Sequence, residues 1–357
     1  MKSDLAIVVG TGVQERICLK LFPALEASPK IHNPQLLSLE QYYRLGLGLS
    51  GLGSLCSLRD FMRRPWYDRS RFQKALSLPP YLYQLLWVSR KIRNFLFFVD
   101  TGVLERSAIH FLKKIGCRVV VLQDAMKRRP LQGSQRSLTW FGGGGADLYL
   151  LTGKRYRFMV RKDSRLEIVG SPIYQKDINP LPPGKKILVV NQCFAKYGEI
   201  SAAAEFQFIE EVVEAAAEYG QVELRLHPHN DMKRYQKLER GSIEVTQKKP
   251  LKQSLIDAGI VLSINSTVIL EALALGRPVV TLKWHPSPFD QPISDVVTSC
   301  SDREEMCALL KRFKTSQHVA GIDPESLQDV ISSFIAFDGT ESRDRIVSSL
   351  EAFVNDW

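Results

Sequence analysis

Residues 262–282, LSINSTVILEALALGRPVVTL, run from the end of one apolar strand through a polar junction and a short apolar helix into a second apolar strand. The junction carries four small polar side chains, Ser263, Asn265, Ser266 and Thr267. In an open α/β sheet, ligands bind beyond the carboxyl ends of the strands, where the next helix offers unpaired N–H groups. The junction is therefore a candidate phosphate-binding site, and ordinary helix capping by Asn265 or Ser266 is the alternative.

The same alternation of apolar strands and helical patterns extends along most of the chain. Near-continuous apolar runs are typical of parallel strands that are buried on both faces. Helical patterns, such as those at 201–219 and 266–275, lie between them. The sequence therefore predicts an α/β protein with two doubly wound parallel sheets. The predicted strands are 5–9, 95–99, 118–122, 147–151 and 166–169 in the first half and 186–190, 222–226, 243–245, 260–263 and 278–282 in the second.

Charge and proline placement divide the chain into two domains. Residues 1–180 carry 29 Lys and Arg against 13 Asp and Glu, whereas the rest carries 19 against 25. The proline-rich segment 178–186 lies at this change and is the expected linker. We predict a basic N-terminal domain at 1–180 with a helical insertion at about 46–93, a C-terminal domain at 181–340, and a C-terminal helix at 341–357 that packs back on the first domain.

The composition excludes several classes of protein. The six cysteines show neither C-x-x-C nor metal-binding spacing, which predicts buried reduced thiols and a cytoplasmic location. No stretch reaches the roughly 18 apolar residues of a membrane span. The glycine turn at 8–16 lacks the third glycine of a dinucleotide-binding loop, and no metal-binding motif is present. We therefore expect no metal and no cofactor.

A second polar segment, HPHN at residues 227–230, directly follows the predicted strand 222–226. Proline fixes the backbone after His227, and a neutral or protonated imidazole can donate to a phosphate oxygen. His227 and Ser266 are both expected to be surface groups at strand ends of one sheet. Glu271, about one turn beyond Ser266, is a candidate acceptor for ribose hydroxyls. Arg277 is a candidate for capping the same helix or for contacting phosphate.

These motifs resemble the nucleotide-binding half of GT-B glycosyltransferases. The resemblance is greatest to bacterial sialyltransferases and polysialyltransferases and to CDP-glycerol glycerophosphotransferases. In those sialyltransferases a His-Pro motif and a later Ser-Ser/Thr motif hold the phosphate of the activated donor, and here they match His227-Pro228 and Ser266-Thr267. The resemblance covers residues 145–285 and implies a GT-B fold, with two Rossmann-like domains facing a central cleft.

The resemblance also implies an activity. The chain is expected to be a metal-independent glycosyltransferase that moves a sialic acid- or Kdo-like sugar from a CMP-activated donor. This donor is a substrate and not a cofactor. Because the first domain is basic, the expected acceptor is an anionic surface glycan or a lipid-linked carrier, as in capsule polysaccharide biosynthesis. His227 would also stabilise the leaving phosphate. The implied donor-binding residues are His227, Pro228, Asn265, Ser266, Thr267 and Glu271.

The general base of such sialyltransferases lies in an acidic motif, Asp/Glu-Asp/Glu-Gly, at a strand end of the first domain. Here the corresponding segment is Gln123-Asp124-Ala125, so only Asp124 matches and the glycine is missing. Asp124 is the predicted catalytic base. An ion pair with Lys127 or Arg128 is the alternative role. The next candidates for the base are Glu15, Asp100 and Glu105.

Two glycine-rich segments have less specific meanings. Gly10, Thr11 and Gly12 follow the first strand, and in a GT-B fold this loop is expected on the acceptor side. The run Gly142 to Gly145 is either a mobile loop at the cleft or a plain flexible connection.

The segment 58–93 interleaves Arg and Lys with Trp, Tyr, Phe and Leu. Such a pattern suits peripheral contact with the inner face of a membrane, an acidic glycan, or a folded helical pair with a solvated basic face. No nucleic-acid-binding motif accompanies the charge, so nucleic acid is not an expected partner.

Three rival functions remain open. One is a CDP-glycerol-type transferase of polyol phosphate, from the same set of enzymes that the chain resembles. A UDP-sugar 2-epimerase shares the fold, but the Asp-Ser-Gly-Gly stretch of that family is absent where SINST stands. A catalytically inactive GT-B module that binds glycan or protein is the third, and the missing glycine after Asp124 favours it.

Overall fold

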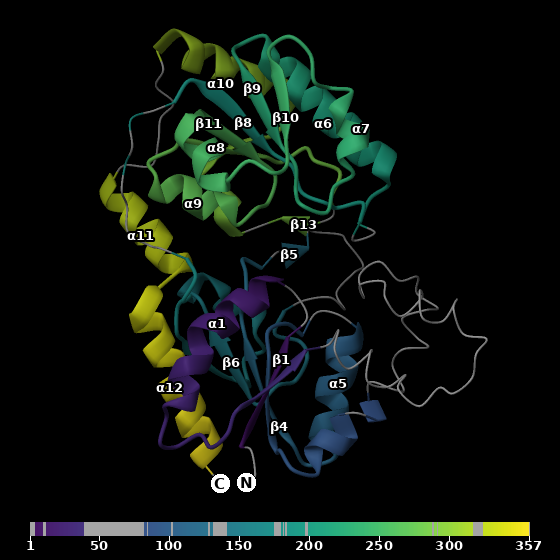
Figure 1. The fold of residues 1–357 in the computed structure, drawn as a ribbon. Coiled ribbons are helices and arrows are strands. Elements are labelled where there is room, and N and C mark those ends of the chain that lie inside the picture. The colour runs from purple at the N-terminus through teal and green to yellow at the C-terminus, as the bar shows by residue number, and fades with distance from the viewer. Residues whose placement is uncertain are drawn as a thin grey trace, which may run out of the picture. The chain divides into compact units, whose positions relative to one another are not determined.

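The computed structural model describes residues 4–9, 12–38, 82–83, 85–100, 103–127, 129–130, 141–174, 180, 182, 184–196, 199–287, 289–290, 292–316 and 324–356. The chain divides into two compact units (Figure 1). The predicted insertion at 46–93 and the segment 58–93 lie mostly outside the described residues. Unit 1 combines Met1–Ala125, Arg136–Tyr174 and Phe334–Trp357, and unit 2 combines Met126–Gln135 and Gln175–Ser333.

Unit 1 is built on a six-stranded sheet with the order β2-β1-β3-β4-β6-β7, in which all neighbouring strands are parallel. The strand order reverses between β1 and β3, so the topological switch point of the sheet lies there. The strands are β1 (Leu5–Val9), β2 (Gln35–Ser38), β3 (Asn94–Phe97), β4 (Arg118–Leu122), β6 (Leu148–Leu151) and β7 (Arg165–Ile168).

Helices cover both faces of the unit 1 sheet. In Figure 1, α1 and α12 lie side by side, and α5 lies across the sheet from them. Alternate strand residues such as Ile7, Leu96 and Val120 form one buried cluster with Leu21 of α1 and Leu350 of α12. Burial of these apolar side chains fixes the C-terminal helix on unit 1. The helices are α1 (Gly12–Glu26), α5 (Val103–Lys114), the 3₁₀ helix η3 (Lys154–Met159) and α12 (Gly339–Asn355).

Unit 2 is built on a second six-stranded parallel sheet, with the order β10-β9-β8-β11-β12-β14. The order reverses between β8 and β11, which are the first and fourth strands of this sheet along the chain. A short antiparallel pair, β5 (Arg129–Pro130) with β13 (Phe289–Asp290), belongs to the same unit. The strands are β8 (Lys186–Val190), β9 (Val222–Arg225), β10 (Ile243–Thr246), β11 (Ala258–Ser263), β12 (Val279–Leu282) and β14 (Thr298–Cys300).

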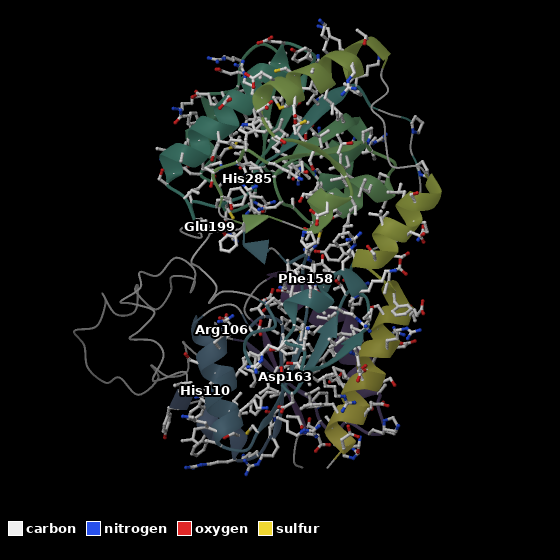
Figure 2. The ribbon with its side chains drawn as sticks, turned by 180° about the vertical axis from the view of Figure 1, so that it is seen from behind. Arg106, His110, Phe158, Asp163, Glu199 and His285 are labelled. Atoms are coloured by element: carbon white, nitrogen blue, oxygen red, sulfur yellow. The ribbon has the colours of Figure 1, made fainter. Side chains whose placement is uncertain are left out.

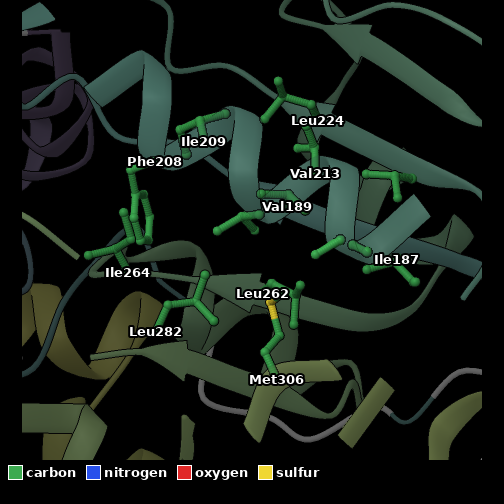
Figure 3. Packing of buried hydrophobic residues seen from close by; sticks show 14 of the residues in the cluster. Ile187, Val189, Phe208, Ile209, Val213, Leu224, Leu262, Ile264, Leu282 and Met306 are labelled. Atoms are coloured by element: carbon green, nitrogen blue, oxygen red, sulfur yellow. The ribbon is translucent and has the colours of Figure 1, made fainter. Parts of the chain in front are cut away.

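The core of unit 2 packs alternate strand residues against α6 and α10. Figure 3 shows side chains such as Val189, Leu224 and Leu262 meeting Val213 of α6 and Met306 of α10. The helices α8 and α9 contact β8, β11 and β12, and their buried residues lie outside this cluster, on the opposite face. The helices are α6 (Ala202–Ala217), α7 (Met232–Gln236), α8 (Leu251–Asp257), α9 (Val268–Ala274), the 3₁₀ helix η4 (Pro292–Asp295), α10 (Arg303–Ser316) and α11 (Pro324–Phe334).

The predicted fold class is confirmed, because both units are doubly wound parallel sheets with helices on each face. The helix predicted at 201–219 begins after Ser201, whose hydroxyl caps it by accepting from the Ala204 N–H. No helix in the described part of the chain is long and apolar enough to span a bilayer. Five cysteines are described and all are free thiols, four of them buried.

Candidate functional site

The carboxyl edge of the unit 2 sheet brings the predicted donor-binding residues together. Asn191 follows β8, His227 follows β9, and Asn265 to Thr267 follow β11. These strands are neighbours, and the order of the sheet reverses between β8 and β11. Ligands of open α/β sheets bind at such a reversal, because the loops there diverge and leave a crevice.

Unsatisfied polar atoms gather at this edge. Among the described residues, nine buried side-chain nitrogen or oxygen atoms lack a hydrogen-bond partner. Five of them belong to residues at or just after the carboxyl ends of β8, β11 and β12. They are both amide atoms of Asn191, Ser263 Oγ, Asn265 Oδ1 and Trp284 Nε1. Burying a polar atom without a partner costs about 1–3 kcal/mol, so such atoms usually meet a ligand or an ordered water. Their concentration at the strand ends makes this edge the candidate binding site of unit 2.

His227 is held in one orientation by its own loop. Its backbone N–H donates to Asn230 Oδ1 (2.8 Å), and its ring Nδ1 accepts from the backbone N–H of His229 (3.2 Å). Burial, with the charges of His229 and Lys196, lowers the pKa of His227 to about 4. The ring is therefore neutral at pH 7, and because Nδ1 accepts a hydrogen bond, the proton lies on Nε2. His227 is partly buried, while Pro228 is exposed.

The buried carboxylate of Glu205 on α6 supports this loop. It accepts hydrogen bonds from the backbone N–H of Ala195 (2.7 Å), from Asn230 Nδ2 (2.9 Å) and from the Tyr235 hydroxyl (2.6 Å). The carboxylate thus joins the loop after β8 to the loop that carries His227. Gln247 completes the support by donating to the carbonyls of His227 (2.9 Å) and Asn230 (3.0 Å).

The polar junction after β11 is more buried than the sequence suggested. Ser266 is 4% exposed, so the expectation of a surface group is wrong for this residue. Its Oγ accepts from the Val268 N–H (3.2 Å), which is the capping role considered as the alternative, and its own O–H proton remains able to donate. Asn265 Nδ2 donates to the Phe289 carbonyl (3.4 Å). The Thr267 side chain is half-buried and forms no cap.

Two further residues of this segment have different positions. Glu271 lies in the first turn of α9 and is half-buried. Arg277 is buried and donates to the carbonyls of Leu255 (2.8 Å) and Ile256 (3.3 Å), at the end of α8. It therefore caps α8, rather than the helix that precedes it in sequence.

The structure adds a second His-Pro element that the sequence analysis missed. His285 and Pro286 follow β12, the next strand beyond β11. His285 Nδ1 accepts from the Ser287 N–H at 3.2 Å, just as His227 accepts from the residue two positions on. The His285 ring stacks on Phe194 with ring centroids 6.4 Å apart. The Ser287 hydroxyl donates to the Glu199 carboxylate at 3.1 Å. His285 and Glu199 are labelled in Figure 2. The repetition of a His-Pro pair after a predicted strand could have identified His285 from the sequence.

In unit 1, Asp124 follows β4 at the carboxyl edge of the sheet, as predicted. It is 7% exposed, and Gln14 on α1 donates to it from Nε2 (3.0 Å). The neighbouring Gln123 is buried; its amide accepts from the Thr152 N–H (3.2 Å) and donates to the Ala125 carbonyl (2.9 Å). Gln123 thus closes the turn that carries Asp124, where the sialyltransferase motif would have a glycine.

Asp100 has a structural role instead of that of a base. Its fully buried carboxylate accepts from the N–H groups of Gly142 (3.0 Å) and Gly144 (2.7 Å) and from the Tyr149 hydroxyl (2.9 Å). A Cβ on Gly144 would lie 2.7 Å from Asp100 Cβ, so the close approach requires glycine there. The glycine run is therefore an anchored turn.

The other predicted positions are only partly described. Gly12 begins α1, while Gly10 and Thr11 lie outside the described residues. Glu15 lies exposed on the first turn of α1, and Glu105 lies on the first turn of α5. Within the described part of the chain, no group of three or more His, Cys, Asp or Glu residues has the arrangement of a metal site.

Two doubly wound parallel sheets in one chain define the GT-B fold, and solved structures agree. MnaA of S. aureus, determined with UDP, aligns with a TM-score of 0.60 at 17% identity over 99% of this chain and 97% of that one. A putative UDP-N-acetylglucosamine 2-epimerase from Listeria monocytogenes aligns with a TM-score of 0.57 at 13% identity, over 100% and 98%. Spinosyn rhamnosyltransferase SpnG with spinosyn aglycone aligns with a TM-score of 0.53 at 16% identity, over 98% and 100%.

No family model and no curated protein matches the sequence. At these identities the solved structures establish the fold alone, which confirms the GT-B expectation. They do not support the finer resemblance to sialyltransferases and CDP-glycerol transferases.

Proposed function

We propose that this chain is a glycosyltransferase that holds a nucleotide-activated sugar on unit 2 and activates an acceptor hydroxyl on unit 1. The observation that carries the proposal is the polar carboxyl edge of the unit 2 sheet. There, Asn191, Ser263 and Asn265 bury unsatisfied polar atoms at the strand-order reversal, beside a neutral His227 fixed by its loop. Hydrogen-bond donors at such an edge suit the phosphate of a nucleotide.

The chemistry follows from the two sets of residues. His227 donates from Nε2, and Ser266 and Thr267 from their hydroxyls, to the phosphate as the bond to the sugar breaks and negative charge develops on it. Asp124 accepts the proton of the acceptor hydroxyl as the new glycosidic bond forms. Donors fixed before the reaction cost no reorganisation in the transition state, which is the role of the Glu205 and Asn230 contacts.

The donor is proposed to carry a pyrimidine nucleotide. The sequence resemblance favours a CMP-linked sialic acid- or Kdo-like sugar, with a CDP-linked polyol as the variant. The S. aureus MnaA structure contains UDP, which makes UDP-sugars a further member of the panel. The proposed acceptor is an anionic glycan or lipid-linked carrier at the inner face of the membrane, and no metal is assigned a role.

A thermal-shift panel of CMP, CDP, UDP and GDP tests the proposal. A nucleotide that binds the folded chain raises the melting temperature by mass action, by an amount set by concentration over Kd. We expect stabilisation by pyrimidine nucleotides and less by GDP. If no nucleotide raises the melting temperature of the parent chain or of His227→Gln, the proposal is contradicted. The alternative of a catalytically inactive module then replaces it.

A UDP-sugar epimerase is the second candidate, because the MnaA structure with UDP and the putative 2-epimerase align with TM-scores of 0.60 and 0.57. Incubation with UDP-N-acetylglucosamine without acceptor distinguishes the two functions. Proton NMR would show a C2 epimer if the chain is an epimerase, and an unchanged sugar if it needs an acceptor.

A further inference from the structure

A basic surface lies in unit 1, on the 3₁₀ helix η3 that follows β6. The segment GKRYRFMVRK, residues 153–162, contains five basic side chains and no acidic one. Phe158 at its centre is 55% exposed, although large aromatic side chains are usually buried. This surface therefore combines one exposed aromatic ring with several exposed cations.

The three-residue period of η3 explains how this surface is built. In a 3₁₀ helix, residues three apart share one face. Tyr156 and Met159 form the buried face and anchor the turn, and Tyr156 packs edge-on against Phe334 at 5.8 Å between centroids. The two remaining faces must then point outward. They carry the pairs Lys154 with Arg157 and Arg155 with Phe158, all four exposed.

The positive charge of the turn is largely uncompensated. Arg161 forms an ion pair with the exposed Asp163 at 3.0 Å. Phe158 and Asp163 are labelled in Figure 2. Within the described part of the chain, Lys154, Arg157 and Lys162 have no carboxylate within 4.0 Å. An anionic ligand therefore gains several charge-assisted contacts on this surface without breaking existing ion pairs.

The turn is joined to the loop that carries Asp124. β6 pairs directly with β4, and η3 and Asp124 follow the carboxyl ends of these two neighbouring strands. The Thr152 N–H donates to Gln123 Oε1, and the Gln123 N–H donates to the Leu150 carbonyl. A ligand bound on η3 therefore lies at the sheet edge that presents the proposed base.

We propose that η3 binds the acceptor of the reaction, and that this acceptor is a glycan bearing carboxylate or phosphate groups. Lys154, Arg157 and Lys162 contact its anionic groups, and Phe158 packs against the apolar face of a sugar ring. The assignment rests on the proposed function only in naming the ligand an acceptor. The binding surface itself stands independently of nucleotide chemistry.

Calorimetric titration with two probes tests the assignment. Oligogalacturonate carries one carboxylate per sugar, and a maltooligosaccharide of equal length is the neutral counterpart. The parent chain is expected to bind the first and not the second, with affinity that falls as salt rises. Lys154→Glu with Arg157→Glu should weaken binding roughly tenfold or more, and Phe158→Ala by several fold. The double reversal Lys311→Glu with Arg312→Glu on α10 is the charge-matched control and should bind as the parent does.

Three results would overturn the assignment. One is equal affinity for both probes, and another is unchanged affinity in the η3 variants. The third is binding of the parent to phosphatidylglycerol vesicles but not to oligogalacturonate, with loss in the η3 variants, which would make η3 a membrane-contact surface. Nucleotide titration of the same variants separates this proposal from the donor site, because their nucleotide affinity should equal that of the parent.

Discussion

Asn230 Nδ2 donates to Glu205 Oε1 at 2.9 Å, while Asn230 Oδ1 accepts from the backbone N–H of His227 at 2.8 Å. One amide thus links a buried carboxylate on α6 to the histidine proposed to contact the donor phosphate. The loop geometry at His227 therefore depends on Glu205, a buried residue on another element.

Glu205→Gln tests this dependence. The Glu205 carboxylate accepts from three donors, on Ala195, Asn230 and Tyr235. The substitution replaces one carboxylate oxygen with an amide nitrogen, which is itself a donor, so a contact with one of these groups becomes repulsive. We expect the free energy of unfolding to fall by about 1–3 kcal/mol and nucleotide affinity to fall several fold. Glu214→Gln, on the exposed face of the same helix, is the control. Urea denaturation and calorimetric titration measure both effects, and an unchanged nucleotide affinity would limit Glu205 to a structural role.

His227→Gln tests the phosphate contact. Loss of a hydrogen bond to a charged oxygen costs about 1.5–3 kcal/mol, so the Kd of the best nucleotide should rise tenfold or more. The neighbouring His229 is exposed, and His229→Gln should leave the Kd unchanged. Equal affinities in parent and His227→Gln, both folded, would remove His227 from the donor site.

The depressed pKa of His227 predicts a pH effect on stability. The folded ring has a pKa of about 4 against an ordinary value of 6.5, so between these values the unfolded chain binds a proton that the folded chain does not. Stability should therefore fall as the pH drops through this window, by on the order of 2 kcal/mol from this ring. In urea titrations at pH 7 and pH 4.5, His227→Gln should lose less stability than the parent. Equal losses would mean that the ring titrates normally in the folded state.

Asp100→Asn should affect stability far more than chemistry. Both carboxylate oxygens of Asp100 accept from the Gly142 N–H, at 3.0 and 3.1 Å, so an amide nitrogen in either position meets that N–H as a second donor. We therefore expect a loss of about 1.5–3 kcal/mol in the free energy of unfolding. Turnover per folded molecule should stay close to that of the parent. A large fall in turnover without loss of stability would instead return Asp100 to the list of candidate bases.

Much of the fold was visible in the sequence because buried parallel strands are continuous apolar runs. The same runs located Asp124 and His227, since each follows a strand directly and parallel strands end at a common edge. Glu205 and Asp100 were not predictable as anchors. Glu205 resembles any acidic residue in a first helical turn, and its role depends on Asn230 and Tyr235, 25 and 30 residues away. Asp100 likewise depends on partners 42 to 49 residues away.

Burial at the site was harder to predict than position. Ser266 follows a strand end, yet it is 4% exposed. Its neighbour Asn265 donates to the Phe289 carbonyl, in the segment that follows β12. That segment also carries His285. Local sequence gives no indication of which loop covers a strand end, since this depends on sheet order.

The turnover of Asp124→Asn is the decisive test of Asp124 as the catalytic base. The variant keeps the size of the side chain and one acceptor oxygen for Gln14, but it cannot take a proton. With a sugar donor that carries the nucleotide selected by the thermal-shift panel, we expect nucleotide release at least about a hundredfold slower than by the parent, with an unchanged donor Kd. A folded variant that releases nucleotide at the parental rate would contradict the assignment of Asp124 as the base.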